Sequence, residues 1–145
     1  KHDAGHKKFL GREGNFTGED ILRIILEQKQ TAIYIASKLY RFFVREEISP
    51  AFAETLGNLL RDNRYEIAPF LRTIFLSEDF YSAPSVATHI KSPTELIVST
   101  YRKLGLRELP TIPDPYTVSK TLGQILLYPP TVAGWSQGRS WITLR

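Results

Sequence analysis

An apolar run between residues 30 and 45 constrains the fold of this 145-residue chain more than any other feature. Its apolar side chains recur at helical spacing and cover most of a helix circumference, leaving Ser37, Lys38, Arg41 and Arg45 as polar positions. A helix that is apolar on nearly all sides must be covered by other elements. The sequence therefore predicts a central helix over about residues 30–45.

Start and stop signals predict five further helices around this segment. Capping side chains stand at Thr17, Ser49, Ser92 and Asp114, and a proline follows each of the last three. Capping boxes are expected where Asp20 follows Thr17 and where Glu95 follows Ser92, and Gly105 is placed to end the helix that begins at Pro93. The expected helices span about residues 18–28, 50–62, 67–77, 93–104 and 115–128.

No alternating strand pattern competes with these helices, so the predicted fold class is all-α. We expect a single orthogonally packed bundle of about six helices in one domain, residues 1–145. Residues 1–16 contain three glycines and are expected to be irregular or to form a short strand pair. The consecutive prolines at 129 and 130 predict a proline-rich strap before the C-terminus, which ends at Trp135 and crosses the bundle. Its indole is expected to be mostly buried against the second or sixth helix.

Composition excludes several classes of protein. The chain has no cysteine, which rules out a disulfide framework, a thiolate metal site and a cysteine nucleophile. Its net charge is +4, but the cations are scattered over several segments, so nucleic-acid binding is not the favoured interpretation. No apolar stretch approaches the roughly 20 residues that a membrane-spanning helix needs. Because the chain begins at Lys1 without Met, we expect a fragment of a longer protein.

Two short motifs could carry chemistry, but their contexts argue against it. Residues 134–138 match the G-x-S-x-G turn that presents Ser136 as a hydrolase nucleophile, yet no histidine follows them and a helix with two prolines precedes them. His2, Asp3 and His6 could approach one metal ion, but a glycine lies between them and no second histidine cluster exists. The sequence therefore predicts no catalytic residue, no cofactor-binding residue and no metal ligand.

Five groups of residues, spread over the whole chain, carry a resemblance to a known family. They are His2-Asp3-Ala4-Gly5 with Lys7 and Leu10-Gly11, Gly14-Asn15-Phe16 with Gly18, Lys38-Leu39-Tyr40-Arg41-Phe42-Phe43-Val44, Lys91-Ser92-Pro93 with Glu95-Leu96, and Gly123-Gln124 through Pro129-Pro130-Thr131-Val132-Ala133-Gly134-Trp135. In order and spacing they resemble the bacterial family called domain of unknown function 1800, and they look like the C-terminal part of its longer domain. The chain departs from the usual pattern of that family at His6 and Ser136. The resemblance implies a helical, often exported bacterial protein that is frequently encoded beside a second exported family, and it supplies no established activity.

A polar seam is the candidate site. Lys38 and Arg41 are neighbours on one face of an otherwise apolar helix, so an anionic group must answer them if they are buried. Glu95 is the candidate anion, and Lys91 and Gln124 belong to the same matching stretches. These residues could converge between the second, fifth and sixth helices. A structural ion-pair network is favoured there over a ligand site. Trp135 joins this set as a candidate interaction residue.

The function predicted from these observations is non-catalytic. We expect an interaction or scaffold module of a larger exported bacterial protein, located in the periplasm or cell envelope, with no cofactor. Its partner is expected to be an unknown protein, with a co-encoded exported protein as one candidate. The alternatives are an enzyme that uses the polar seam as its site and a nucleic-acid binder.

Overall fold

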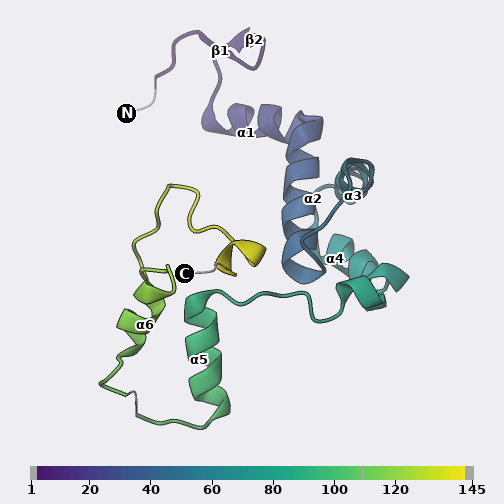
Figure 1. The fold of residues 1–145 in the computed structure, drawn as a ribbon. Coiled ribbons are helices and arrows are strands. Elements are labelled where there is room, and N and C mark those ends of the chain that lie inside the picture. Colours follow the sequence, from purple (N-terminus) through teal and green to yellow (C-terminus); the bar gives the residue numbers. More distant parts are fainter. Residues whose placement is uncertain (1–2, 109, 143–145) are drawn as a thin grey trace. The chain divides into compact units, whose positions relative to one another are not determined.

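The computed structural model describes residues 3–108 and 110–142, and these are mostly helical (Figure 1). The chain divides into two compact units, Lys1–Thr88 and His89–Arg145, which are described separately. The single domain expected from the chain length stays a prediction. In chain order the elements are β1 (Lys7–Phe9), β2 (Arg12–Gly14), α1 (Gly18–Glu27), α2 (Lys29–Phe43), α3 (Pro50–Asp62), α4 (Ile67–Phe75), the 3₁₀ helices Glu78–Tyr81 and Ala83–Ser85, α5 (Pro93–Lys103), α6 (Pro115–Thr121) and the 3₁₀ helix Gly138–Trp141.

The N-terminal segment forms a short strand pair, one of the two structures expected for it from the sequence. β1 and β2 are antiparallel, and Phe9 lies opposite Arg12 across a two-residue turn. Leu10 and Gly11 in that turn both have positive φ, 45° and 79°, which matches the right-handed twist of a tight hairpin. Glycine adopts this geometry without steric cost, so Gly11 favours the turn.

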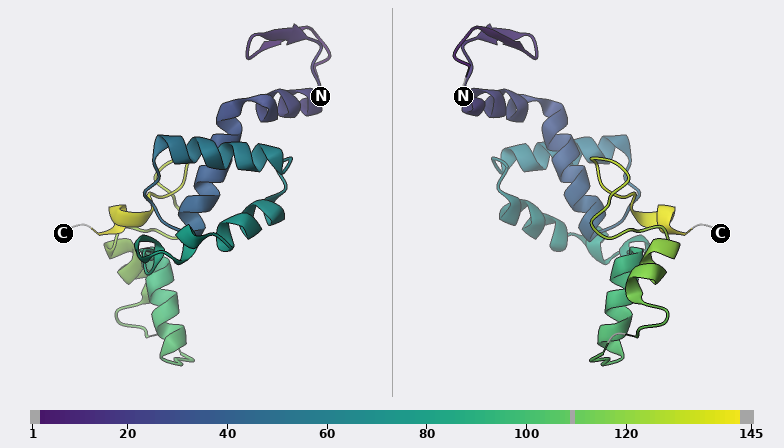
Figure 2. Two further views of the ribbon diagram at one scale, coloured as in Figure 1. Left: turned by 90° about the vertical axis from the view of Figure 1, so that its right-hand side faces the viewer. Right: turned by 90° about the vertical axis from the view of Figure 1, so that its left-hand side faces the viewer.

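The core of the first unit is built around α2, as predicted. Helix α2 contributes Ala36 and Tyr40, and Val44 caps its end. These side chains pack with Leu56 and Leu60 of α3 and with Phe70 and Ile74 of α4. Figure 1 shows α3 end-on beside α2, and Figure 2 shows it lengthwise, so the two helices cross steeply. One face of α2 is therefore covered by helices that follow it in the chain, whereas Tyr34, Phe42 and Phe43 of the same helix remain exposed.

A glycine allows α3 to approach α2 closely. Gly57 is buried, and a Cβ atom at this position would lie 2.6 Å from Cγ1 of Ile33 and 2.9 Å from its backbone N and Cα. Carbon atoms in contact are normally about 3.5–4.0 Å apart. A side chain at position 57 would therefore force the two helix backbones apart.

The sixth helix, in the second unit, is shorter than predicted. Helix α6 ends at Thr121 rather than continuing to about residue 128. Gly123 has a φ of +99°, and hydrogen bonds from the amides of Gly123 and Gln124 to the carbonyls of Lys120 and Ser119 close a Schellman motif. The signal was present in the sequence as Gly123, but the apolar spacing through Leu126 concealed it.

The segment after α6 makes a turn at residues 131–134, where the Gly134 amide donates to the Thr131 carbonyl at 3.0 Å. Val132 at the tip of this turn is fully exposed. Trp135 is partly buried. Its packing against the second or sixth helix stays a prediction.

Replacing Gly57 with alanine is expected to destabilise the protein by about 1–3 kcal/mol, because the added methyl group overpacks the crossing of α2 and α3. This outcome opposes helix propensity, which favours alanine over glycine by roughly 1 kcal/mol. Chemical denaturation measures the change. Gly18→Ala is the matched control, since no atom lies within 4 Å of a Cβ there, and equal effects of the two substitutions would contradict the close approach.

Candidate functional site

A cluster of four polar side chains ties the end of α2 to the segment that follows α4. The cluster consists of Tyr40 in α2, Arg45 just beyond it, Asp79 in the 3₁₀ helix Glu78–Tyr81, and Ser85. The Tyr40 hydroxyl donates to Oδ2 of Asp79, and an Arg45 Nη atom donates to Oδ1 of Asp79 and to Oγ of Ser85, at 2.6 Å each. Ser85 also donates to the Asp79 carbonyl at 2.7 Å. We call these residues the polar cluster.

The electrostatics of the polar cluster favour one protonation state. Burial alone would raise the pKa of Asp79, but hydrogen bonds from Tyr40 and Arg45 and the Arg45 charge together hold it below its usual range. Burial and the hydrogen bond to Asp79 raise the pKa of the Tyr40 hydroxyl. The tyrosine therefore remains a donor and the aspartate an anion over the physiological pH range.

A surface depression lies beside the polar cluster and has a mixed lining. The Arg41 Nε atom donates to the Glu46 carbonyl at 3.2 Å within it. The charged atoms of Arg45 and Asp79 in the lining bind each other, so they form a fixed pair rather than free acid and base groups. The lining residues are Arg41, Arg45, Glu46, Glu47, Ile48, Ser49, Phe52 and Asp79.

The two predicted seam residues of the first unit are exposed. The ammonium group of Lys38 lies 5.6 Å from the centroid of the Tyr34 ring, and Arg41 lines the depression described above. Because both side chains are exposed to water, neither needs a buried anionic partner. Their predicted convergence with residues of the second unit stays a prediction.

The other predicted polar residues surround the first turn of α5. Gln124 is 8% exposed, and its side-chain oxygen accepts from the Thr94 amide at 2.9 Å. Glu95 accepts from the Ser92 amide at 2.8 Å, and this hydrogen bond lowers the pKa of Glu95. Lys91 donates to the Ser99 hydroxyl at 2.8 Å. Each of these groups has a structural partner in α5 or at its N-terminus, and the capping box predicted at Ser92 is confirmed.

The structure groups no three metal-ligating side chains within residues 3–108 and 110–142. His2, which the sequence placed beside Asp3 and His6, lies outside the described residues. Oδ1 of Asp3 accepts from the Gly5 amide at 2.8 Å. Among the described helices, none is long and apolar enough to cross a membrane.

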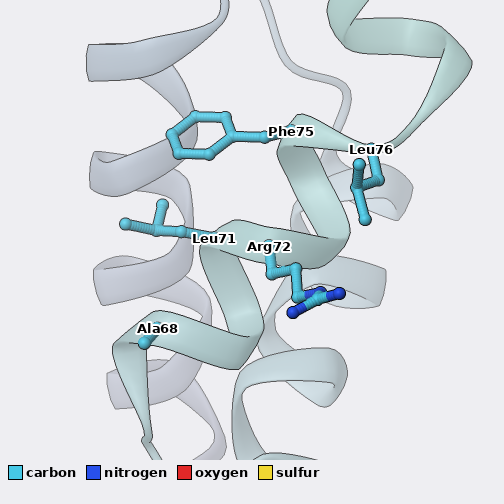
Figure 3. Close-up of a pocket in the computed structure, with 5 residues that line it drawn as sticks. All are labelled: Ala68, Leu71, Arg72, Phe75 and Leu76. Carbon is cyan, nitrogen blue, oxygen red and sulfur yellow. The ribbon is translucent and has the colours of Figure 1, made fainter.

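An apolar hollow lies on α4. Leu71 and Phe75 reach out from one side of the helix, whereas Arg72 and Leu76 lie on the other (Figure 3). Ala68 completes the lining one turn earlier. Leu76 is 71% exposed although it is a large apolar residue. We call this surface the α4 hollow.

A row of aromatic rings borders the α4 hollow. Phe75 stacks edge to face on Phe43 and contacts Phe80, with ring centroids 5.3 and 5.1 Å apart. Phe42 and Tyr81 extend the row at its two ends and are strongly exposed. Edge-to-face packing holds such rings in place, so the exposed apolar surface here is fixed rather than loosely arranged.

Neither the polar cluster nor the α4 hollow was predicted from the sequence. Arg45 and Asp79 are 34 positions apart, and no spacing rule connects an arginine beyond one helix with an aspartate in a 3₁₀ turn. The sequence carried no signal for the hollow, because Leu76 continues the apolar pattern of its helix and only the structure shows that it is exposed.

Tyr40→Phe is expected to lower the free energy of unfolding by about 1–2 kcal/mol at neutral pH, because Asp79 loses a hydrogen bond. Folding raises the pKa of Tyr40, so its contribution is complete below the unfolded value near pH 10 and declines as the pH rises above it. The stability difference between wild type and variant should therefore shrink at alkaline pH. Denaturant titrations from about pH 7 to 11 measure it. The control is Tyr34→Phe, which alters an exposed ring. A stability difference between wild type and Tyr40→Phe that does not change with pH would contradict the hydrogen bond between Tyr40 and Asp79.

Comparison with known proteins gives one match. A family model described as "Protein of unknown function (DUF1800)" matches residues 1–145. No curated protein and no solved structure matches the chain. Because the model covers the whole sequence, the resemblance seen in the His2–Gly5, Lys38–Val44 and Pro129–Trp135 stretches is confirmed, and the chain belongs to the DUF1800 family.

Proposed function

We propose that this chain is a non-catalytic protein-interaction module and that the α4 hollow is its docking surface. The observation that carries the proposal is an apolar hollow with an unpaired cation in its lining. Within the described part of the chain, the Arg72 side chain has no hydrogen-bond or ion-pair partner, and it lies beside the exposed Leu76. Fixed apolar surface next to an available charge is typical of a protein-binding site.

The chemistry of the hollow selects one kind of partner. Leu76 lies on the same side of α4 as Arg72 and offers exposed apolar surface to a large apolar side chain, and the guanidinium of Arg72 can bind a carboxylate in a two-point geometry. A helix that presents an apolar residue and an acidic residue one turn apart would satisfy both requirements. The proposed occupant is therefore an acidic amphipathic helix of a partner protein.

The state of the polar cluster favours binding over catalysis. Asp79 and Arg45 are bound to each other, and Tyr40 donates to Asp79, so these groups serve to hold the segment after α4. That segment carries Phe80, which packs on Phe75 at the edge of the hollow. The ionisable groups thereby support the proposed docking surface.

The setting of the module is also part of the proposal. Export from a bacterial cell, with the chain acting inside a larger protein in the periplasm or cell envelope, is supported by the family resemblance. A co-encoded exported protein is then the first partner to examine for an acidic amphipathic helix.

A display selection of random helical peptides against the full chain tests the docking surface. We expect enrichment of peptides that carry Leu, Ile, Phe or Trp one turn from Asp or Glu. Leu76→Ser should weaken the binding of the selected peptides at least about tenfold, because the substitution removes apolar surface that a partner would bury. Arg72→Glu should also weaken them, and replacing the acidic residue of the peptide with lysine should restore binding to that variant.

The matched control is Leu22→Ser on α1, where leucine is about as exposed as Leu76 but lies outside the hollow. This substitution should leave peptide binding unchanged. A selection that enriches no sequence, or peptides that bind Leu76→Ser and wild type equally, would contradict the proposed surface.

A further inference from the structure

The net positive charge of this chain comes from its second unit. Residues 89–145 hold seven Lys and Arg residues against three Asp and Glu residues, whereas residues 1–88 hold twelve of each. Two of the three acidic residues, Glu95 and Asp114, cap the N-termini of α5 and α6. The second unit therefore presents cations with little compensating negative charge.

Three of these cations gather with two leucines where α5 ends. Arg102 and Lys103 lie in the last turn of the helix, and Arg107 follows shortly after it. Leu104 is 67% exposed and Leu106 is 48% exposed. We call residues 102–107 the basic leucine turn. In Figures 1 and 2 it lies at the end of α5 remote from the C-terminal segment of the same unit.

The backbone of the basic leucine turn is fixed by the helix end. Gly105 has a φ of +67°, its amide donates to the Arg102 carbonyl, and the Leu106 amide donates to the Tyr101 carbonyl. These bonds form a Schellman motif, which sets the direction in which the chain leaves the helix. The leucines are thus held in an exposed position by a defined turn rather than by a loose loop.

The cations of the turn remain available for a ligand. Among residues 3–108 and 110–142, no acidic side chain pairs with Arg102, Lys103 or Arg107. Cations at the C-terminus of a helix interact favourably with its dipole, which accounts for Arg102 and Lys103. It does not account for Arg107 or for the two exposed leucines.

We propose that the basic leucine turn binds the surface of an anionic lipid bilayer. Lysine and arginine are attracted to acidic lipid headgroups, and exposed leucines can enter the boundary between the headgroups and the acyl chains. The three cations and two leucines within six residues supply both contributions at one place. A nucleic acid would use the cations but would leave both leucines in water, so a lipid surface fits the turn better.

Co-sedimentation of the full chain with vesicles tests this inference. The probes are vesicles of phosphatidylcholine alone and vesicles with about one third phosphatidylglycerol. We expect binding to the anionic vesicles only, with weaker binding as the salt concentration rises, because salt screens the attraction. Absence of binding to the anionic vesicles at low salt would overturn the proposal.

Single substitutions with matched controls locate the binding surface. Lys103→Glu should weaken vesicle binding about tenfold or more, since each cation near an acidic membrane contributes roughly a fivefold factor. The control Lys120→Glu makes the same charge change at an exposed residue of α6 and should have a much smaller effect. Equal effects of the two lysine substitutions would show attraction by net charge alone and would overturn the assignment to this turn.

The leucines separate a lipid surface from a nucleic acid. Leu104→Ser should weaken vesicle binding severalfold, whereas Leu127→Ser, at another exposed leucine of the second unit, should not. Binding of duplex DNA with no loss on Leu104→Ser, together with no vesicle binding, would replace the lipid proposal with a nucleic-acid one. Leu76→Ser should leave vesicle binding unchanged, so this test and the peptide selection on the α4 hollow can fail independently.

Discussion

The burial of α2 is the constraint on which the rest of the first unit depends. Because α2 carries apolar side chains around most of its circumference, it cannot remain at a surface without exposing a large apolar area to water. Helices α3 and α4 supply the cover, with Leu56, Leu60, Phe70 and Ile74 as the buried contributions. Helix α3 packs closely on α2 because Gly57, which has no side chain, lies against the backbone of α2 at Ile33. A side chain at position 57 would therefore disturb the packing of α3 on α2.

Burial of α2 also explains why the first unit needs the polar cluster. Tyr40 lies in the core, so its hydroxyl must find a partner there, since an unpaired buried hydroxyl is costly. Asp79 provides the acceptor, and Arg45 compensates the negative charge that the carboxylate brings. Through these bonds the segment after α4 is fastened to α2, and Phe80 is placed against Phe75. The requirement of one buried hydroxyl thereby helps to shape the surface that we propose as a docking site.

The second unit is organised around polar groups instead of large apolar ones. Its buried residues among those described are Pro93, Ser119 and Gln124. The Gln124 side chain accepts from the Thr94 amide, and the Ser119 hydroxyl donates to the Gln124 carbonyl, so α5 and α6 are joined by hydrogen bonds at their adjoining ends. No leucine of this unit is among its described buried residues, and several, including Leu104 and Leu127, are exposed.

The sequence by itself determined the helical class, the family and the positions of most helix starts, because these depend on local physics. A cap such as Ser92 with Glu95 satisfies amides within one turn, and apolar spacing reports the buried face of a single helix. The same local logic failed at α6, where apolar residues beyond Gly123 suggested a longer helix than the Schellman motif permits. Only the tertiary structure decided that Arg45 meets Asp79, that Gln124 caps α5 through Thr94, and that Leu76 remains exposed beside Arg72. These contacts join residues distant in the chain or depend on which helix face is left uncovered, and no local preference of the residues specifies either.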